Sequence, residues 1–314
     1  MNLVHQREVL LLVEKCSHCF STYDLATGRR ISSVPLPAYP HEFVTDSDNR
    51  FAYVGHYGVE HSGITGPGGH TILQIDLHLS KLVRSIDLSP FNRIHGLQMD
   101  MQDRLYALSE EKATLLVLDA PRTDTAPRRA VSSGGIKSHL FALSRDGQTA
   151  YCMNLLSHTV AKVRPWDPLF TPVLCSPGEK PEGYALSADE RTLYVTNRWS
   201  RTLAAIDTET MQVKASAPSR DDPTRLYLHA DGQRMLVTNY GERSLSIVDP
   251  QTLRELAHVP TGARAIALSF HPTRPLAYVS LDDDRVGIFN LDSCEFEGHI
   301  ATQREPDVSK VVML

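Results

Sequence analysis

The sequence has 314 residues, of which 41% are hydrophobic and 22% are charged, and its formal net charge is −5. A chain of this length and composition can bury a full core, and the acidic balance argues against nucleic acid or an anionic membrane as a partner. The first apolar run, Val9–Val13, is too short for the hydrophobic region of an export signal or for a membrane span. We expect a cytoplasmic protein, with the alternative that an export signal has already been removed.

The chain opens with three short apolar runs that are separated by polar turns, at Val9–Val13, Phe20–Asp24 and Ile31–Leu36. Runs of this length between turn residues predict β-strands. A fourth run of this kind stands at the other end of the chain, over residues 307–314. We predict that this C-terminal strand joins the N-terminal strands and closes a ring without a free edge.

From Pro40 onward the same unit recurs: an apolar run ending in Asp, Ser or His, a polar turn, and a second apolar run. The residues that end the first runs are 54, 44, 43, 42 and 40 positions apart, and they are Asp46, Asp100, Ser144, Ser187, His229 and Ser269. A repeat of about 40–45 residues with several short strands is typical of a β-propeller. We predict a single all-β domain over residues 1–314, a seven-bladed β-propeller with four-stranded antiparallel blades. Blade 1 combines 1–36 with 307–314, and blades 2 to 7 cover about 40–88, 93–131, 137–175, 180–217, 223–259 and 263–300.

A four-residue motif marks the second strands of the later units. YVTN stands at 194–197 and VTN recurs at 237–239, whereas the earlier units have YVGH, YALS and YCMN. The third strands end in an apolar residue, an Asp and a short turn, as at Ile206-Asp207. The chain resembles the YVTN-repeat seven-bladed propellers, within the lactonase-like and amine-dehydrogenase-heavy-chain-like superfamily. The resemblance implies the fold but no single activity, because related propellers include lactonase-like enzymes, redox-enzyme subunits, lyases and binding proteins.

One position, five residues before the end of the first strand, carries reactive side chains in most units. First strands line the central channel of a propeller, so these side chains are expected to meet at one mouth of it. They are His41, His95, His139, Glu182, Thr224 and Arg264. Glu42 and Arg225 follow two of these positions, and we expect the closing strand to add Ser309 or Lys310.

The loops after the second strands lie at the same face as the starts of the first strands. They contribute a second tier of polar and aromatic residues, which includes His56, Tyr57, Glu110, Asn154, Arg198, Trp199, Tyr240 and Asp282. The segment from His56 to His70 is rich in glycine, so it is expected to be a loop rather than a strand. Such a loop can fold over the mouth as a lid.

Two chemical interpretations remain open. In the first, His41, His95, His139 and Glu182 bind a divalent metal, since imidazoles with a carboxylate suit zinc, manganese or iron. In the second there is no metal, and a histidine acts with Glu182 or Glu42 as general base and acid. In both, arginine binds a carboxylate or phosphate of the substrate through paired hydrogen bonds. The expected substrate-binding residues are Arg225, Arg264, His56, Tyr57, Arg198, Tyr240 and Lys310.

These residues predict an enzyme that acts on a small anionic substrate, such as a sugar acid, a lactone or an organic acid. Lyase, isomerase and lactonase chemistry all fit. The alternative is a non-catalytic propeller that binds a ligand, or a protein partner on its rim. A redox-subunit role is less favoured, because no C-x-x-C-H motif is present to attach a haem. The Cys16–Cys19 pair is interpreted as part of a hairpin turn.

Overall fold

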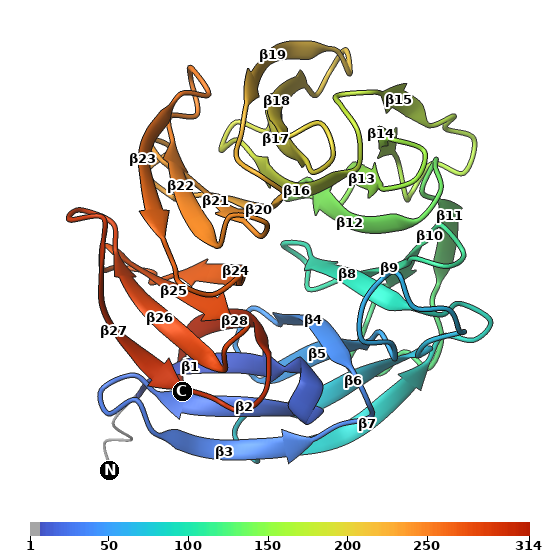
Figure 1. Cartoon of the computed structure of the whole chain (residues 1–314). Helices are drawn as coiled ribbons and strands as arrows, with labels where there is room; N and C mark the ends of the chain where they lie inside the picture. The colour runs from blue at the N-terminus through green and yellow to red at the C-terminus, as the bar shows by residue number, and fades with distance from the viewer. Residues whose placement is uncertain (1–6) are drawn as a thin grey trace.

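The computed structural model describes residues 7–314 and contains seven four-stranded antiparallel sheets around a central channel (Figure 1). In each sheet the first strand lies innermost and the fourth outermost, as the all-β propeller prediction requires. Blade 1 consists of β28 (Pro306–Met313), β1 (Glu8–Glu14), β2 (Cys19–Asp24) and β3 (Arg30–Pro35). Blade 2 consists of β4 (Pro40–Thr45), β5 (Phe51–His56), β6 (Thr71–Asp76) and β7 (Lys81–Asp87).

The remaining blades follow in chain order. Blade 3 has β8 (Ile94–Met99), β9 (Leu105–Ser109), β10 (Thr114–Leu118) and β11 (Arg129–Ser132), and blade 4 has β12 (Ser138–Leu143), β13 (Ala150–Asn154), β14 (Thr159–Val163) and β15 (Val173–Cys175). Blade 5 has β16 (Pro181–Leu186), β17 (Thr192–Asn197), β18 (Thr202–Asp207) and β19 (Val213–Pro218), and blade 6 has β20 (Pro223–Leu228), β21 (Met235–Asn239), β22 (Ser244–Val248) and β23 (Glu255–Pro260). Blade 7 has β24 (Ala265–Phe270), β25 (Leu276–Leu281), β26 (Arg285–Asn290) and β27 (Glu295–Ala301).

The core lies between neighbouring blades. Second strands such as β9 and β13 are buried along their whole length, because both of their faces are covered by adjacent sheets. One apolar cluster, for example, joins Leu11 and Phe20 of blade 1 to Val54 and Leu73 of blade 2. The outermost strands, such as β19, are mostly exposed. Each blade is therefore held in place by the two blades beside it.

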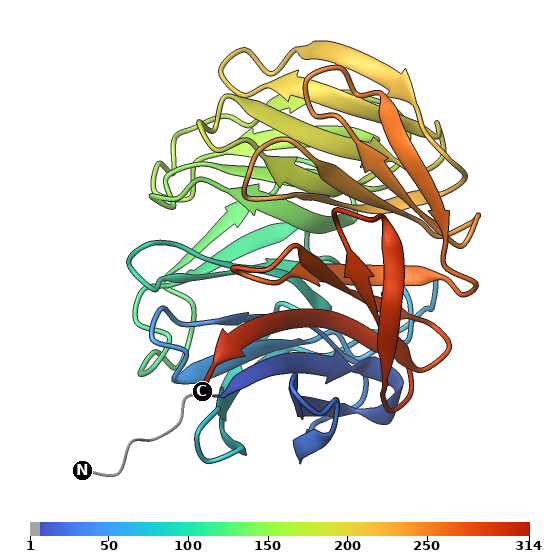
Figure 2. The same ribbon diagram turned by 90° about the vertical axis from the view of Figure 1, so that its left-hand side faces the viewer.

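The C-terminal strand closes the ring, as the sequence predicts. β28 pairs with β1, with Val312 opposite Val9 and Val311 opposite Leu10. Figures 1 and 2 both show the C-terminus beside the start of β1. The closure gives blade 1 its fourth, innermost strand and places the first and last blades in direct contact, because β28 packs against β24 and β25.

The asparagine of the YVTN motif has a structural role. Asn197, at the end of β17, donates hydrogen bonds from Nδ2 to Thr202 Oγ1 at 3.1 Å and to the backbone oxygen of Pro177 at 3.2 Å. Asn154 and Asn239 make the equivalent bond to Thr159 and Ser244, the residues five positions further on. The motif thus ties the end of a second strand to the start of the third strand.

The turn between β1 and β2 contains the one helix in residues 7–314, a short 3-10 helix over Lys15–Ser17. No helix in this part of the chain has the length and apolar character needed to cross a membrane. The Cys16 thiol donates to Glu305, and the Cys19 thiol donates to Glu14. Both cysteines are free, and they lie in and next to the turn between β1 and β2, as predicted.

Replacing Val312 with Asp tests how far the fold depends on ring closure. Val312 is 5% exposed and packs into the cluster shared by blades 1 and 2. An unpaired carboxylate there is expected to lower the free energy of unfolding by about 3 kcal/mol, because a charge is buried without a partner. Urea unfolding measures the change. The matched control is Met313→Asp on the neighbouring, 44% exposed residue, which should stay close to the wild type; equal losses in both variants would contradict this account.

Candidate functional site

Each innermost strand has an irregularity in its pairing near its start. In blade 4, Ser138 pairs with Asn154 and Leu140 with Met153, so His139 has no partner residue in the ladder. The same break occurs in the other blades. Bulges of this kind redirect a side chain out of the plane of the sheet. One residue per blade is presented here, and together they form the channel ring: Asp307, His41, His95, His139, Glu182, Thr224 and Ile266.

The blade 7 member of this ring differs from the sequence prediction. In blade 6 the ring residue, Thr224, follows Pro223, which pairs with Asn239. The equivalent pair in blade 7 is Ala265 with Leu281, so the ring residue is Ile266 and not Arg264. The reason is that the strand turns at His271, two residues later than the serine used to count the repeat. Arg264 lies outside the ring, with its side chain 44% exposed, 3.7 Å from Asp282 and over the ring of Tyr240.

The closing strand also contributes a residue other than the one expected. Its ring member is Asp307, which is fully buried, and not Ser309 or Lys310. The Lys310 ammonium donates to Thr45 Oγ1 at the far end of β4, away from the mouth. A sequence signal was available, because Pro306-Asp307 matches Pro40-His41 and Pro181-Glu182, the starts of two other inner strands.

Three imidazoles of the ring stack in a row. The ring centroids of His41 and His95 are 4.2 Å apart, and those of His95 and His139 are 3.7 Å apart. Tyr57 packs edge-on against His95 with a centroid distance of 4.8 Å. Burial lowers the pKa of His41 and of His95 well below the usual value, so both are neutral at physiological pH.

His139 is held by a carboxylate behind it. Its Nδ1 lies 2.5 Å from Glu110 Oε2, while the Tyr57 hydroxyl donates to Glu110 Oε1 at 2.9 Å and Arg93 donates to the same oxygen at 3.3 Å. Burial would raise the pKa of Glu110, but the hydrogen bonds and charge of His139, helped by Tyr57, lower it overall. Glu110 is thus an ionised acceptor, which requires the Nδ1 of His139 to carry the proton.

The other nitrogen of His139 faces a second buried carboxylate. His139 Nε2 lies 4.0 Å from Glu182 Oε1, too far for a direct hydrogen bond but close enough for one water molecule to contact both. Glu182 accepts a bond from Arg198 at 2.8 Å, and Arg198 also binds Asp222. Burial by itself would raise the pKa of Glu182, but the charge of Arg198, with smaller contributions from His139 and Arg225, lowers it to about 2.

A mouth cavity of about 380 Å³ lies above these residues. Residues 60–63 of the glycine-rich loop form part of its wall, which agrees with the expected lid. The loop is tied down by Arg93, which donates to the backbone oxygens of Ile64 and Gly66, and by Lys137, which donates to that of Ser62. Of the predicted site residues, those lining the mouth cavity are His41, Tyr57, His139, Glu182, Arg198, Arg225 and Tyr240.

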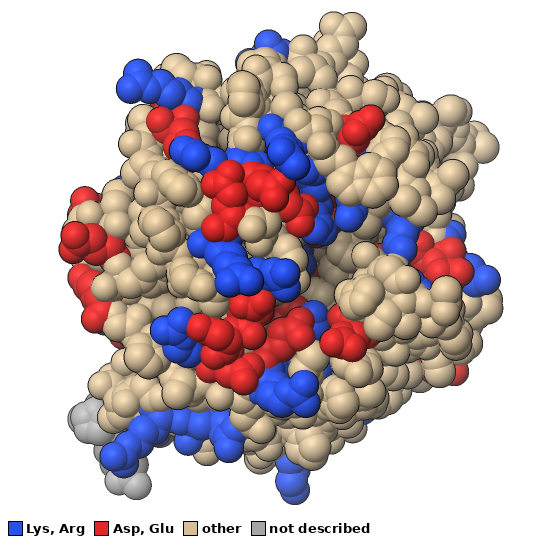
Figure 3. Space-filling model, viewed as in Figure 1, with Lys and Arg blue, Asp and Glu red and all other residues tan. Residues whose placement is uncertain are grey.

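The remaining predicted residues lie elsewhere. His95 is fully buried behind Tyr57, and His56 Nδ1 lies 3.3 Å from Thr71 Oγ1 outside the cavity. Sequence reasoning assigned no role to Lys15 and Lys180, which line the mouth cavity. It placed Glu110 at the mouth but did not predict its contact with His139. Figure 3 shows acidic and basic side chains gathered around the centre of one face of the molecule, with smaller charged groups at its left, right and lower edges.

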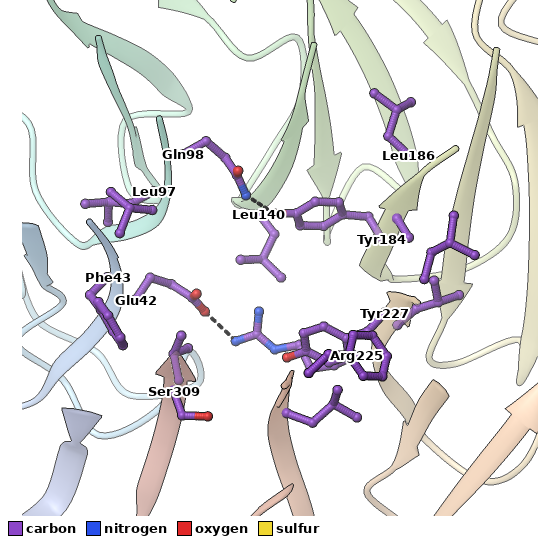
Figure 4. A pocket seen from close by; sticks show the side chains of 17 residues that line it. Glu42, Phe43, Leu97, Gln98, Leu140, Tyr184, Leu186, Arg225, Tyr227 and Ser309 are labelled. Carbon is purple, nitrogen blue, oxygen red and sulfur yellow. Dashed lines mark hydrogen bonds and ion pairs between the residues drawn. The ribbon is translucent and has the colours of Figure 1, made fainter. Parts of the chain in front are cut away.

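An ion pair crosses the channel below the mouth cavity. Arg225 donates to Glu42 Oε1 at 2.7 Å, and both residues are almost fully buried. Beneath the pair is an inner cavity of about 410 Å³, lined mostly by apolar side chains together with the hydrogen-bonded pair Gln98 and Tyr184 (Figure 4). The Glu42–Arg225 pair therefore divides the channel into two compartments, and Glu42 belongs to the inner one.

Neither a protein-family model nor a curated protein sequence matches this chain. Several solved structures are similar to this chain in fold. A putative 6-phosphogluconolactonase from Bacteroides fragilis aligns with a TM-score of 0.78 and 14% identity over 98% of both chains. A second one, from Bacteroides uniformis, aligns with a TM-score of 0.77 and 15% identity over 98% of this chain and 100% of that chain.

A protein of unknown function from Desulfotomaculum acetoxidans aligns equally well, with a TM-score of 0.76 and 13% identity over 97% of this chain and 98% of that chain. The chain is a seven-bladed β-propeller. At these identities the similarity shows the fold alone, and the activity must be argued from the site.

The low pKa of Glu182 makes stability depend on pH. The ionised carboxylate favours the folded state above its ordinary pKa of 4.5, and this contribution is lost as the pH falls toward about 2. The shift corresponds to about 3 kcal/mol. Denaturant unfolding should therefore show a difference between the wild type and Glu182→Gln that shrinks by about that amount as the pH falls from 5 toward 2. The exposed neighbour Glu179, changed to Gln, is the control, and a pH-independent difference for Glu182→Gln would contradict the assignment.

Proposed function

We propose that this protein is a lactonase-type hydrolase that acts on a small anionic substrate in the mouth cavity. The observation that carries the proposal is the arrangement of His139, whose Nδ1 is held by Glu110 while its Nε2 faces the cavity and Glu182. A histidine oriented by a buried carboxylate is the usual arrangement of a general base. Lactonase chemistry is favoured over lyase or isomerase chemistry by the similarity to two putative 6-phosphogluconolactonases.

In the proposed reaction a water molecule lies between His139 Nε2 and Glu182 Oε1. The water attacks the carbonyl carbon of the lactone as His139 Nε2 takes its proton, and the carbonyl oxygen becomes an oxyanion. When the oxyanion collapses, the ring C–O bond breaks and the imidazolium returns the proton to the leaving alkoxide, which gives the hydroxy acid. Glu110 stabilises the transient imidazolium, because its carboxylate is 2.5 Å from Nδ1.

Cations around the cavity favour an anionic substrate. Arg198 and Arg225 already have carboxylate partners, Glu182 and Glu42. Lys180 also lines the cavity; over residues 7–314 its ammonium has a cation–π contact with Trp199 at 5.4 Å but no ion pair. Burial lowers the pKa of Lys180, with help from the charge of Arg198. An anionic group of the substrate would provide the missing partner.

We also infer that the blades are YVTN repeats. The motif residues at the ends of β13, β17 and β21 make the same asparagine bond, which supports a common repeat unit in blades 4 to 6.

Exchange of His139 tests the proposed base. His139→Ala is expected to lower kcat for hydrolysis of sugar-acid lactones by about 100-fold or more, since general-base catalysis contributes about 10²–10⁴-fold. Glu110→Gln, which keeps the base but removes the carboxylate that orients it, is expected to lower kcat by about tenfold. A pH-stat assay with gluconolactone and 6-phosphogluconolactone measures the rates. Glu111→Gln, an exposed neighbour of Glu110, is the control and should retain the wild-type rate. Wild-type rates in His139→Ala would exclude the mechanism.

Lys180→Met tests the preference for an anion. The variant removes the charge but keeps most of the side chain, so KM for a phosphorylated lactone is expected to rise about tenfold while kcat changes little. KM for the neutral lactone should stay the same. An equal change for both lactones would indicate that Lys180 acts through packing and not through its charge.

A non-catalytic, ligand-binding propeller is the second candidate. It is favoured by the pairing of Arg198 and Arg225 with carboxylates of the protein itself, which leaves fewer free cations than a phosphate-binding site usually presents. This candidate predicts that lactones and sugar acids bind in calorimetry without turnover, and that binding tolerates Glu110→Gln.

A further inference from the structure

Three side chains of the channel ring, two of which line the mouth cavity, have buried polar atoms without hydrogen-bond partners. Within residues 7–314 these atoms include His41 Nδ1, both nitrogens of His95 and both carboxylate oxygens of Asp307. His95 and Asp307 are fully buried. A buried polar atom without a partner costs about 1–3 kcal/mol, so a group of them in one place indicates a bound species.

The positions of these atoms fit a cation. Ligand atoms of His41, Glu42 and His95 all lie within 4.8 Å of one another. Asp307 Oδ2, from β28 of the neighbouring blade 1, is outside this group but lies 3.4 Å from His41 Nδ1. We propose that His41, Glu42 and His95, with Asp307 as a further ligand, bind one divalent transition-metal ion at the centre of the channel.

Charge favours a metal ion over a neutral occupant. The buried cations around the site already have carboxylate partners: Arg225 binds Glu42, and Lys15 binds Glu305. The nearest recorded cation to Asp307 is the Lys15 ammonium at 3.9 Å, which is beyond hydrogen-bond distance. Asp307 therefore shares Lys15 with Glu305 and has no hydrogen bond of its own, and buried carboxylates are stabilised by close pairing or by metal coordination.

The donor atoms define the class of metal. Two imidazole nitrogens with one or two carboxylates suit zinc, manganese or iron(II). Magnesium and calcium prefer all-oxygen ligand sets. The surroundings also resemble those of metal sites, because Glu42 is fixed by Arg225 at 2.7 Å and Tyr57 packs edge-on against the rings of His41 and His95.

This ligand set differs from the one that the sequence predicts. His139 Nδ1 binds Glu110, and neither His139 nor Glu182 has a ligand atom in the group that lies within 4.8 Å. His139 stacks on His95 with a centroid distance of 3.7 Å but contributes no ligand atom to the group. His139 is consequently a control histidine in the same stack, beside the proposed ligands.

The site can be reached from both compartments of the channel. His41 and Asp307 line the mouth cavity, whereas Glu42 lines the inner cavity. Figure 4 shows Glu42 at the edge of the inner cavity, directed toward Arg225. Metal binding is independent of the proposed hydrolysis, in which the metal has no part, and it can be measured on the protein without substrate.

The experiment measures zinc and manganese binding to the full chain. Protein stripped with a chelator is dialysed against Zn²⁺ or Mn²⁺, and the bound metal is counted by elemental mass spectrometry; magnesium serves as the negative ion. We expect about one Zn²⁺ or Mn²⁺ per chain in the wild type. Affinity should fall at least tenfold in His41→Ala and His95→Ala, the range seen even for loss of outer-shell partners, and stay within about threefold of the wild type in His139→Ala.

Asp307→Asn is a second test that can be used if a histidine variant fails to fold, because asparagine has nearly the same size and shape as aspartate. It should weaken metal binding at least tenfold and retain the far-ultraviolet circular dichroism of the wild type. Wild-type protein that binds no Zn²⁺ or Mn²⁺, or that binds them no more tightly than His95→Ala, would overturn the metal site and leave the proposed hydrolysis standing. Equal loss of metal in His139→Ala would overturn the ligand set. Metal binding by a protein that hydrolyses no lactone would count against the proposed function alone.

Discussion

Closure of the ring by β28 is the constraint on which the rest of the molecule depends. Pairing of β28 with β1 brings residues from both ends of the chain into one blade and holds the seven inner strands around a common axis. Only then can a bulge at the start of each inner strand direct one side chain to the same region. The same closure delivers Asp307, which lies next to His41 although 266 positions separate them in the sequence. The chemistry of the channel is thus a consequence of its topology.

Buried charge organises the channel into layers. At the mouth, Arg198 joins Glu182 to Asp222, and Glu110 orients His139. Across the middle, Arg225 and Glu42 form a pair that separates the two cavities. Removing a charge from water costs free energy unless the charge is paired. Each of these side chains is therefore fixed in position by its oppositely charged partner. His41 and His95, both neutral, lie between these layers. Beside them the carboxylate of Asp307 is buried without a hydrogen-bond partner, which is the most unusual feature of the ring.

The repeat period predicted the fold well, because every unit must supply one buried second strand and one inner strand. It also predicted that His41, His95, His139 and Glu182 share one position. The prediction was wrong in blade 7, because Ser269 lies inside β24 and His271 is the residue at which the strand turns, so the count was two residues too early and gave Arg264 in place of Ile266. It missed Asp307 because the closing strand has no turn and second strand of its own after it, so counting back from the turn was not possible and only the Pro306-Asp307 match could have found it.

The sequence by itself determined the blade architecture, the closing strand and the identity of most residues at the channel mouth, since these follow from hydrophobic periodicity and local turns. The tertiary structure alone decided which charges meet. Glu110 and His139 are 29 positions apart, and Arg225 and Glu42 are 183 apart. Their pairing depends on side-chain length, bulge geometry and the width of the channel. Those pairings in turn decide which ring residues are charged and which have an unpaired donor or acceptor atom. A repeat pattern cannot predict this, because it shows which residue occupies a position but not which side chain faces it across the channel.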